Sequence, residues 1–120
     1  MKFLNEEKTS WEYRGRTMSI NLSDIQNVKY FERAEVIGYL VGKVKYNPKK
    51  LVVYSMDGKL QNEISPPEGY QFGYLTSYYD AEIAVICGVI DYANSNEVCR
   101  DFYFGLDLET GLLSRLGIAR

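Results

Sequence analysis

The side chains of this 120-residue sequence that could take part in catalysis or binding are its carboxylates, its tyrosines and its two cysteines, because the chain contains no histidine. Histidine is the commonest general base and metal ligand in proteins. Its absence excludes Ser-His-Asp and Cys-His arrangements and leaves few ways to hold a metal. We therefore predict no catalysis and no metal or other cofactor, and we expect the chain to act by binding.

The cysteines suggest structural positions. Cys87 lies in the apolar run 83–90 and is expected to be a small core residue. Cys99 stands beside Arg100, whose charge could lower the pKa of the thiol, but no base or oxyanion site accompanies it. The pair has no metal-site spacing and is too small for a disulfide framework, which favours a reduced, cytoplasmic protein.

Carboxylates also recur at i,i+2 spacing, in Asp80 with Glu82 and in Asp107 with Glu109. On a strand this spacing places both members of a pair on one face. A carboxylate hydrolase would need such groups on either side of a cleft. Both pairs lie at expected strand ends or turns, where acids are usually solvated, so a hydrolase or ligand-binding domain stays open only if a concave pocket exists.

Residues 60–99 form the most unusual stretch, since they contain no Lys or Arg. They carry six carboxylates and five tyrosines: Glu63, Glu68, Asp80, Glu82, Asp91 and Glu97, with Tyr70, Tyr74, Tyr78, Tyr79 and Tyr92. These tyrosines are either core-facing residues below a solubilising acidic surface, or anchors that capture Lys and Arg by cation–π contacts and charge-assisted hydrogen bonds. The second interpretation predicts a partner-binding face made of Glu63, Glu68, Tyr70, Tyr78, Tyr79, Asp80 and Glu97.

The charge is divided along the chain. Residues 1–50 carry ten Lys and Arg against six Asp and Glu, whereas residues 51–120 carry four against ten. An acidic second half argues against direct nucleic-acid binding, which needs a basic face. No apolar run reaches the length of a membrane helix, and the apolar start of the chain stops after two residues, so we expect neither membrane insertion nor export.

Residue patterns predict a single, mainly β domain over 1–120, an antiparallel meander of about eight strands in one or two sheets with little helix. Residues 1–10 read as a short helix or a docked arm, and Ser23-Asp24 could cap a helical turn. The expected strands are 11–14, 17–20, 28–31, 36–46, 51–56, 59–64, 70–76, 81–91, 101–108 and 112–118, some of them short.

Two turns and one strand stand out in this pattern. Asp57-Gly58 predicts a hairpin whose two central residues both have positive φ, and Gly111 suits a left-handed position in a second hairpin. The run 81–91 is almost wholly apolar and is predicted to be a central strand that is covered on both faces.

Parts of the chain also resemble one another. Residues 34–46 align with 81–92, and 51–58 with 104–111, which suggests two blade-like units of about 50 residues at 28–65 and 70–118. The turn Leu106-Asp107-Leu108-Glu109-Thr110-Gly111 resembles the Leu-Asp-x-x-Thr-Gly turn of quinoprotein-type β-propeller repeats, although the tryptophan that follows it there is missing. This resemblance implies four-stranded blades. Two blades cannot close a ring, so they must pack face to face, form an incomplete propeller or pair between chains.

In overall profile the chain is similar to the small bacterial immunity proteins that neutralise nuclease toxins: short, acidic and without catalytic residues. This similarity implies a basic partner protein, a nuclease toxin in that family, whose cationic cleft the acidic face would block. The rival hypothesis is a self-associating, propeller-like scaffold whose strand edges pair to form a homodimer or larger assembly.

Overall fold

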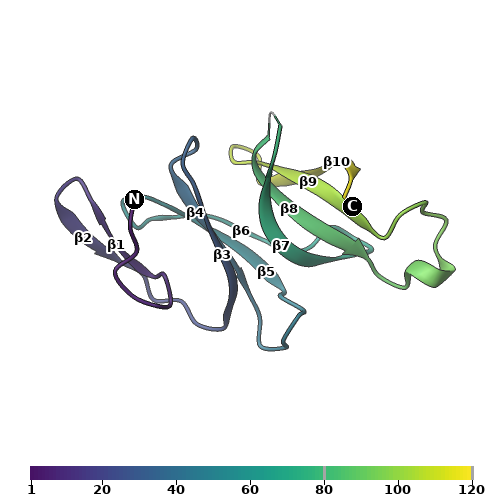
Figure 1. Ribbon diagram of the computed structural model, residues 1–120, viewed down its shortest axis with the longest axis horizontal. Coiled ribbons are helices and arrows are strands. Elements are labelled where there is room, and N and C mark those ends of the chain that lie inside the picture. Colours follow the sequence, from purple (N-terminus) through teal and green to yellow (C-terminus); the bar gives the residue numbers. More distant parts are fainter. Residues whose placement is uncertain (80, 120) are drawn as a thin grey trace.

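The computed structural model describes residues 1–79 and 81–119 and shows a chain built almost entirely of antiparallel strands (Figure 1). An N-terminal hairpin contains β1 (Ser10–Tyr13) and β2 (Arg16–Ser19). The first sheet contains β3 (Ile25–Phe31), β4 (Val36–Val41), β5 (Lys50–Ser55) and β6 (Leu60–Ile64). The second sheet contains β7 (Tyr70–Tyr78), β8 (Ala81–Val89), β9 (Asp101–Asp107) and β10 (Leu112–Ile118).

The predicted mainly β fold class is confirmed, but the numbers of strands and sheets differ from those expected. The described residues form ten strands in three sheets, where about eight strands in one or two sheets were expected. The one helical element among them is a short 3₁₀ turn, η1 (Tyr92–Asn94). No helix of the described residues is long and apolar enough to cross a membrane.

The two four-stranded sheets have the same topology. Each is a simple meander, in the order β3-β4-β5-β6 and β7-β8-β9-β10. The aligned segments 34–46 and 81–92 contain β4 and β8, the second strand of each sheet. The other aligned pair covers most of β5 and the last four residues of β9, the third strand of each sheet. The similarity in sequence therefore coincides with equivalent positions in the fold.

The main core lies between the sheets. From the first sheet, Leu40, Leu51 and Val53 enter it, and from the second Phe72, Val85 and Cys87 are among those that meet them. All five residues from Ile83 to Cys87 are buried, which confirms that β8 is covered on both faces. Ala84 and Ile86 are buried but belong to neither apolar cluster, so they point to the outer face of the second sheet.

The outer face of the first sheet is covered by the N-terminal hairpin. Trp11 is fully buried there against Ile37, Tyr39 and Met56. Its indole N–H donates to the carbonyl oxygen of Met56 at 2.8 Å, and the Tyr39 hydroxyl donates to the carbonyl oxygen of Lys8 at 2.6 Å. Residues 1–9 thus form a docked arm, with a bridge from Phe3 to Trp11, and the alternative of a short helix is wrong.

The second sheet has no such cover from the hairpin. In Figure 1 the purple hairpin lies at one end of the molecule, beside the first sheet, and the green-to-yellow second sheet lies at the other end. The N-terminal hairpin contributes to the cluster on the first sheet, whereas no residue of the second sheet belongs to that cluster among the parts described. The outer face of the second sheet is therefore presented at one end of the long axis.

Two local predictions in the first half are wrong. The helical turn at 23–27 does not form, because β3 already begins at Ile25. The strand predicted over 36–46 ends at Val41. Beyond this point the Gln26 side chain, and not a neighbouring strand, makes hydrogen bonds to backbone groups. Its amide nitrogen donates to the Gly42 carbonyl at 2.9 Å, and its amide oxygen accepts from the Tyr46 N–H at 3.1 Å.

The two hairpin turns also differ from each other. Between β5 and β6 the Gly58 N–H donates to the Ser55 carbonyl at 3.0 Å, and Gly58 has φ +83°. Asp57 is not in the left-handed region, so the predicted turn with two positive φ values is corrected to one that needs only the glycine. In the second hairpin, Gly111 has φ +71°, as predicted.

Candidate protein-binding surface

The predicted partner-binding residues do not form one continuous face. Tyr70 begins β7 and Tyr78 ends it. Eight residue steps along a strand span roughly 26 Å, so these two tyrosines lie at opposite ends of the sheet. The structure therefore divides the set into a group near Tyr70 and a group near Tyr78, while Asp80 lies outside the described residues.

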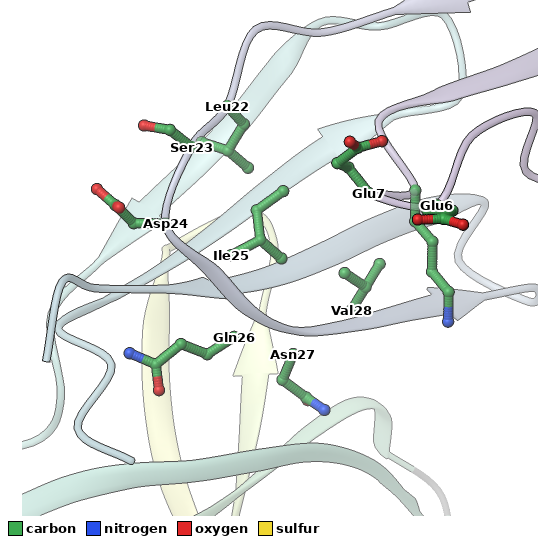
Figure 2. Close-up of a pocket in the computed structure, with 10 residues that line it drawn as sticks. Glu6, Glu7, Leu22, Ser23, Asp24, Ile25, Gln26, Asn27 and Val28 are labelled. Carbon is green, nitrogen blue, oxygen red and sulfur yellow. The ribbon is translucent and has the colours of Figure 1, made fainter. Parts of the chain in front are cut away.

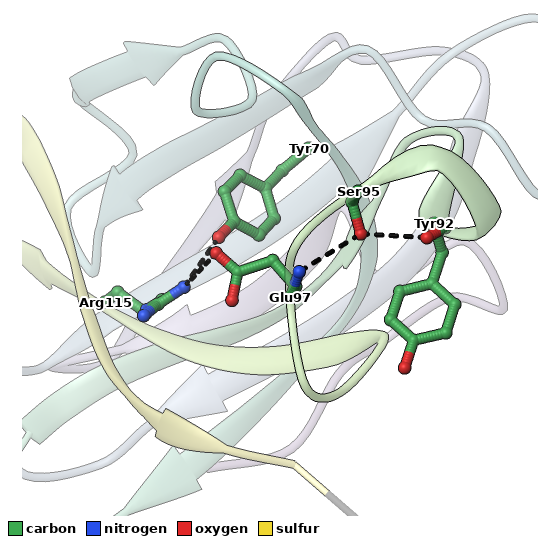
Figure 3. Close-up of polar contacts among 5 residues, drawn as sticks. All are labelled: Tyr70, Tyr92, Ser95, Glu97 and Arg115. Atoms are coloured by element: carbon green, nitrogen blue, oxygen red, sulfur yellow. Dashed lines mark hydrogen bonds and ion pairs between the residues drawn. The ribbon is translucent and has the colours of Figure 1, made fainter.

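The group near Tyr70 is held together by Arg115 of β10 (Figure 3). One guanidinium nitrogen of Arg115 donates to the Tyr70 hydroxyl at 3.1 Å and to the Glu97 carboxylate at 2.9 Å. These hydrogen bonds to Tyr70 and Glu97 raise the pKa of Arg115 above its usual value. The negative charge of Glu97 is thus balanced within the chain.

The Tyr70 ring belongs to the core side of the second sheet. It packs edge-on against Phe104, with ring centroids 4.8 Å apart, and against Phe102 at 6.2 Å. Arg115 lies 4.3 Å above the centroid of Phe102 and so caps this aromatic group. Of the two interpretations of the tyrosines, the core-facing one describes the Tyr70 ring.

The two remaining acids of the predicted set are exposed. Glu63 lies on β6, where its register partner is Val52, and Glu68 lies in the loop that connects the two sheets. Both carboxylates are therefore accessible to solvent.

The group near Tyr78 forms a tyrosine cluster, defined here as Tyr78, Tyr79 and Tyr103. The Tyr78 ring lies 4.9 Å from that of Tyr79, at 76°, and 4.6 Å from that of Tyr103, at 40°. An open hollow of about 480 Å³ is lined by these three residues together with Ser77 and Ile118. The cluster therefore combines aromatic faces with access from solvent, and Tyr79 is 88% exposed.

Sequence reasoning missed Tyr103. Its signal was the alternation in β9, where Phe102 and Phe104 are buried in the core and Tyr103 must point the other way. Gly117 makes room for the cluster, because a β-carbon at that position would lie 2.8 Å from the Tyr78 hydroxyl. In the sheet, Gly117 is the register partner of Tyr103, which places it beside the tyrosine that was missed.

An acidic hollow adjoins the cluster. It is open, has a volume of about 720 Å³ and is lined by three carboxylates and six uncharged residues: Glu82, Asp107, Glu109, Ala81, Ile83, Gly105, Leu106, Leu108 and Leu116. Ala81 is the register partner of Tyr78, so the acidic hollow begins where the tyrosine cluster ends. Of the carboxylates considered as candidate acid–base pairs, Glu82, Asp107 and Glu109 thus lie beside the tyrosine cluster, and Asp80 lies outside the described residues.

A further hollow of about 440 Å³ lies against the N-terminal arm (Figure 2). Glu6 and Glu7 lie on its arm side, whereas Leu22, Ile25 and Val28 form an apolar lining. Lys8 also lines it, so the acids there share the hollow with a cation of the same chain. This hollow was not predicted from the sequence.

Little in the described residues favours metal or thiol chemistry. No group of three or more His, Cys, Asp or Glu side chains that could hold a metal ion occurs among them. Cys87 is fully buried, and burial raises the pKa of its thiol to about 12. A protonated, inaccessible thiol is a poor nucleophile, so Cys87 is a core residue, as predicted.

Comparison of the chain with protein-family models, with curated proteins and with solved structures found no match in any of the three.

Proposed function

We propose that this chain is a non-catalytic domain that binds a basic protein, and that it serves as an inhibitor or immunity protein for a nuclease-type toxin. The observation that carries this proposal is the distribution of charge. The Lys- and Arg-free stretch 60–99 supplies β6, β7 and β8, and its carboxylates at Glu63, Glu68 and Glu82 are exposed. A surface with one sign of charge attracts and orients a partner of the opposite sign.

The positive charges of the second half do little to offset these acids. Arg115 is bonded to Glu97, and Lys59 lies 3.8 Å from Asp57. The guanidinium of Arg100 lies 5.8 Å from the ring centroid of Tyr92. Exposed carboxylates remain on β6, on the loop after it and on the second sheet with its connections: Glu63, Glu68, Glu82, Asp91, Asp107 and Glu109. This surplus supports recognition of a cationic surface.

The inhibitory mechanism follows from this arrangement. A nuclease must present Lys and Arg to bind the phosphates of its substrate. A rigid acidic sheet that docks on those residues would occupy the same charges and exclude nucleic acid. Exposed tyrosines supply the packing and cation–π contacts that a purely ionic surface lacks.

The experiment is co-expression with the product of the adjacent gene, followed by affinity measurement for a basic protein recovered in the complex. One variant carries Glu63→Lys, Glu68→Lys, Glu82→Lys and Asp107→Lys. Its matched control carries four exposed acids of the first half changed in the same way, Glu6→Lys, Glu7→Lys, Glu12→Lys and Glu32→Lys. We expect at least about a tenfold loss of affinity in the first variant and a much smaller loss in the control. Equal losses would contradict an acidic recognition surface on the second half.

A scaffold that associates with itself is the second candidate, and the β10 edge favours it. This strand borders the second sheet and exposes 65% of Leu112, 39% of Leu116 and 38% of Ile118. An apolar edge strand is a template for pairing with another strand. Sedimentation at several concentrations tests this candidate: a mass that rises with concentration, with no basic partner recovered, would favour it over the inhibitor.

A further inference from the structure

We infer that the basic partner docks on the outer face of the second sheet, with an Arg or Lys side chain stacked on the tyrosine cluster and its charge shared with the acidic hollow. This inference rests on the proposed function and narrows it to one surface. The surface differs from the face predicted by sequence, because it omits Tyr70 and Glu97 and includes Tyr103, Asp107 and Glu109.

The floor of this surface is built from small or apolar residues. Ala84 and Ile86 lie on it and are almost fully buried, and Gly105 is the register partner of Ala84. The nearest contact of Gly105 is Leu116, whose side chain lies 3.0 Å from the position a β-carbon would take. Side chains from β7, β9 and β10 thus cover Ala84 and Ile86 on the outer face of the sheet. These covering side chains are themselves accessible to a partner.

The chemistry of the accessible groups selects a cation. Tyr79 is 88% exposed and Tyr74 is 55% exposed, so aromatic faces are available beside the buried floor. A guanidinium or ammonium group is attracted to such faces, and Arg also stacks on them. The acidic hollow next to the cluster is lined by three carboxylates and by no Lys or Arg among the described residues. Ring faces and carboxylates together suit one cationic side chain and its basic neighbours.

The same charges disfavour a second copy of the chain on this face. A twofold contact would bring Glu82, Asp107 and Glu109 of one copy towards the same residues of the other. Like charges held close together in an interface cost free energy. The hollow at the N-terminal arm is also less suited to a cation, because Lys8 lines it together with Glu6 and Glu7.

The test is an NMR titration of the full chain with three peptides of equal length: hexa-arginine, hexa-lysine and neutral hexa-citrulline. We expect the two basic peptides to shift the amide signals of Tyr74, Tyr78, Tyr103, Gly105 and Leu116, and the neutral peptide to shift none. Shifts confined to Glu63, Glu68 or the arm hollow would overturn the assignment to this face and leave the proposed function standing. No binding of either basic peptide would overturn both.

Two pairs of variants sharpen the assignment. Tyr79→Ala removes an exposed ring of the cluster, and Tyr46→Ala removes a ring that is 81% exposed but already lies below Lys45 of its own chain. We expect Tyr79→Ala to weaken binding of hexa-arginine about two- to fivefold and Tyr46→Ala to leave it unchanged. Equal effects would contradict stacking on the cluster.

The second pair compares equal losses of charge. One variant carries Glu82→Gln, Asp107→Asn and Glu109→Gln, and the other carries Glu63→Gln, Glu68→Gln and Asp91→Asn. The first should weaken hexa-arginine binding several-fold more than the second. If the two variants bind alike, attraction is a property of the whole second half and the acidic hollow has no special part in it. Unchanged amide spectra of β4, which carries none of these substitutions, verify that each variant is folded.

Discussion

At the scale of single residues, burial decides which groups can react. The chain has two cysteines, and neither is in a disulfide: Cys87 lies in the main core, and Cys99 is half-buried against it. The sequence placed Cys87 correctly, because an uninterrupted apolar run is enough to predict its burial. It could not predict the Tyr70–Arg115–Glu97 group, whose members lie 18 and 45 positions from Arg115 and meet only through the fold.

The two thiols should therefore react at very different rates. With its pKa raised to about 12, Cys87 has roughly one thiolate in ten thousand molecules at pH 8, and it is also inaccessible. Alkylation of the native protein at pH 8, followed by peptide mass analysis, should label Cys99 and spare Cys87. In urea both cysteines should be labelled, which serves as the control. Equal labelling in the native protein would show that the core between the sheets opens readily.

The same burial predicts the response to alkaline pH. Burial raises the folded-state pKa of Cys87 and that of Tyr39, so the neutral side chains favour the folded state. Their contribution is fully present below about pH 9 and is lost as pH rises towards 12, at up to about 1.4 kcal/mol per pH unit for each group. Urea unfolding between pH 7 and pH 11 measures the loss. The variant Cys87→Ala should lose stability less steeply above pH 9, and a slope identical to that of the parent chain would contradict this cause.

At the scale of elements, most strands could be predicted because β-branched and aromatic residues concentrate in them. The prediction for 112–118 matches β10 in full, and 81–91 overruns β8 by two residues. The largest error, the strand predicted over 36–46, occurred where a side chain distant in sequence satisfies backbone groups, as Gln26 does after Val41. Strand propensity depends only on the residues of the segment itself. Hydrogen bonds of this kind depend on which distant side chain the fold places beside the segment.

The half-buried Asn27 side chain makes a hydrogen bond between the two sheets, and this bond should contribute clearly to the stability of the fold. The Asn27 side-chain oxygen accepts from the backbone N–H of Leu75 at 2.7 Å, next to an irregularity in β7. Asn27→Ala leaves that N–H without its partner and should destabilise the fold by about 1–3 kcal/mol. Asn62→Ala is the control, because its contact with the Leu108 carbonyl is 3.4 Å and its side-chain oxygen is buried without a partner. Urea unfolding compares the two, and a larger loss for Asn62→Ala would contradict this ranking.

The N-terminal hairpin should detach as a unit when its anchor is removed. Trp11→Ala deletes the ring at the centre of the cluster on the first sheet and the bond to Met56, a change that typically costs about 3–5 kcal/mol at a buried site. Hydrogen exchange should then accelerate in β1 and β2 and change little in β8 and β9. Uniform acceleration along the chain would show that the hairpin and both sheets unfold together.

At the scale of the whole molecule, which is 51 Å long, the hairpin and the first sheet lie towards one end and the second sheet lies towards the other (Figure 1). The basic residues 1–50 form the hairpin, β3 and β4, whereas the acidic residues 51–120 supply most of β5, all of β6 and the whole second sheet. The sequence predicted the asymmetry. It could not predict that Tyr78 and Tyr103 meet on an outer face, because that contact depends on the two register shifts in the pairing of β7 with β8.

Binding of a cationic probe should be strongly dependent on salt. The Debye length is about 10 Å at 0.1 M salt, much shorter than the molecule, so the positive first half is screened from a probe on the second sheet. We expect the affinity for hexa-arginine to fall at least about tenfold between 0.05 and 0.5 M NaCl. Isothermal titration calorimetry measures this fall. Salt-independent binding would mean that packing on the tyrosines, and not charge, provides the affinity.

The position of Trp11 has a consequence for how this molecule can be observed. It is the one tryptophan in the sequence, and it is sealed between the N-terminal hairpin and the first sheet, away from the tyrosine cluster. Its emission therefore reports on the first half of the chain and not on the outer face of the second sheet. A partner bound at that face should leave the indole emission spectrum unchanged. Trp11 fluorescence can therefore be used to check that the protein stays folded while a partner binds.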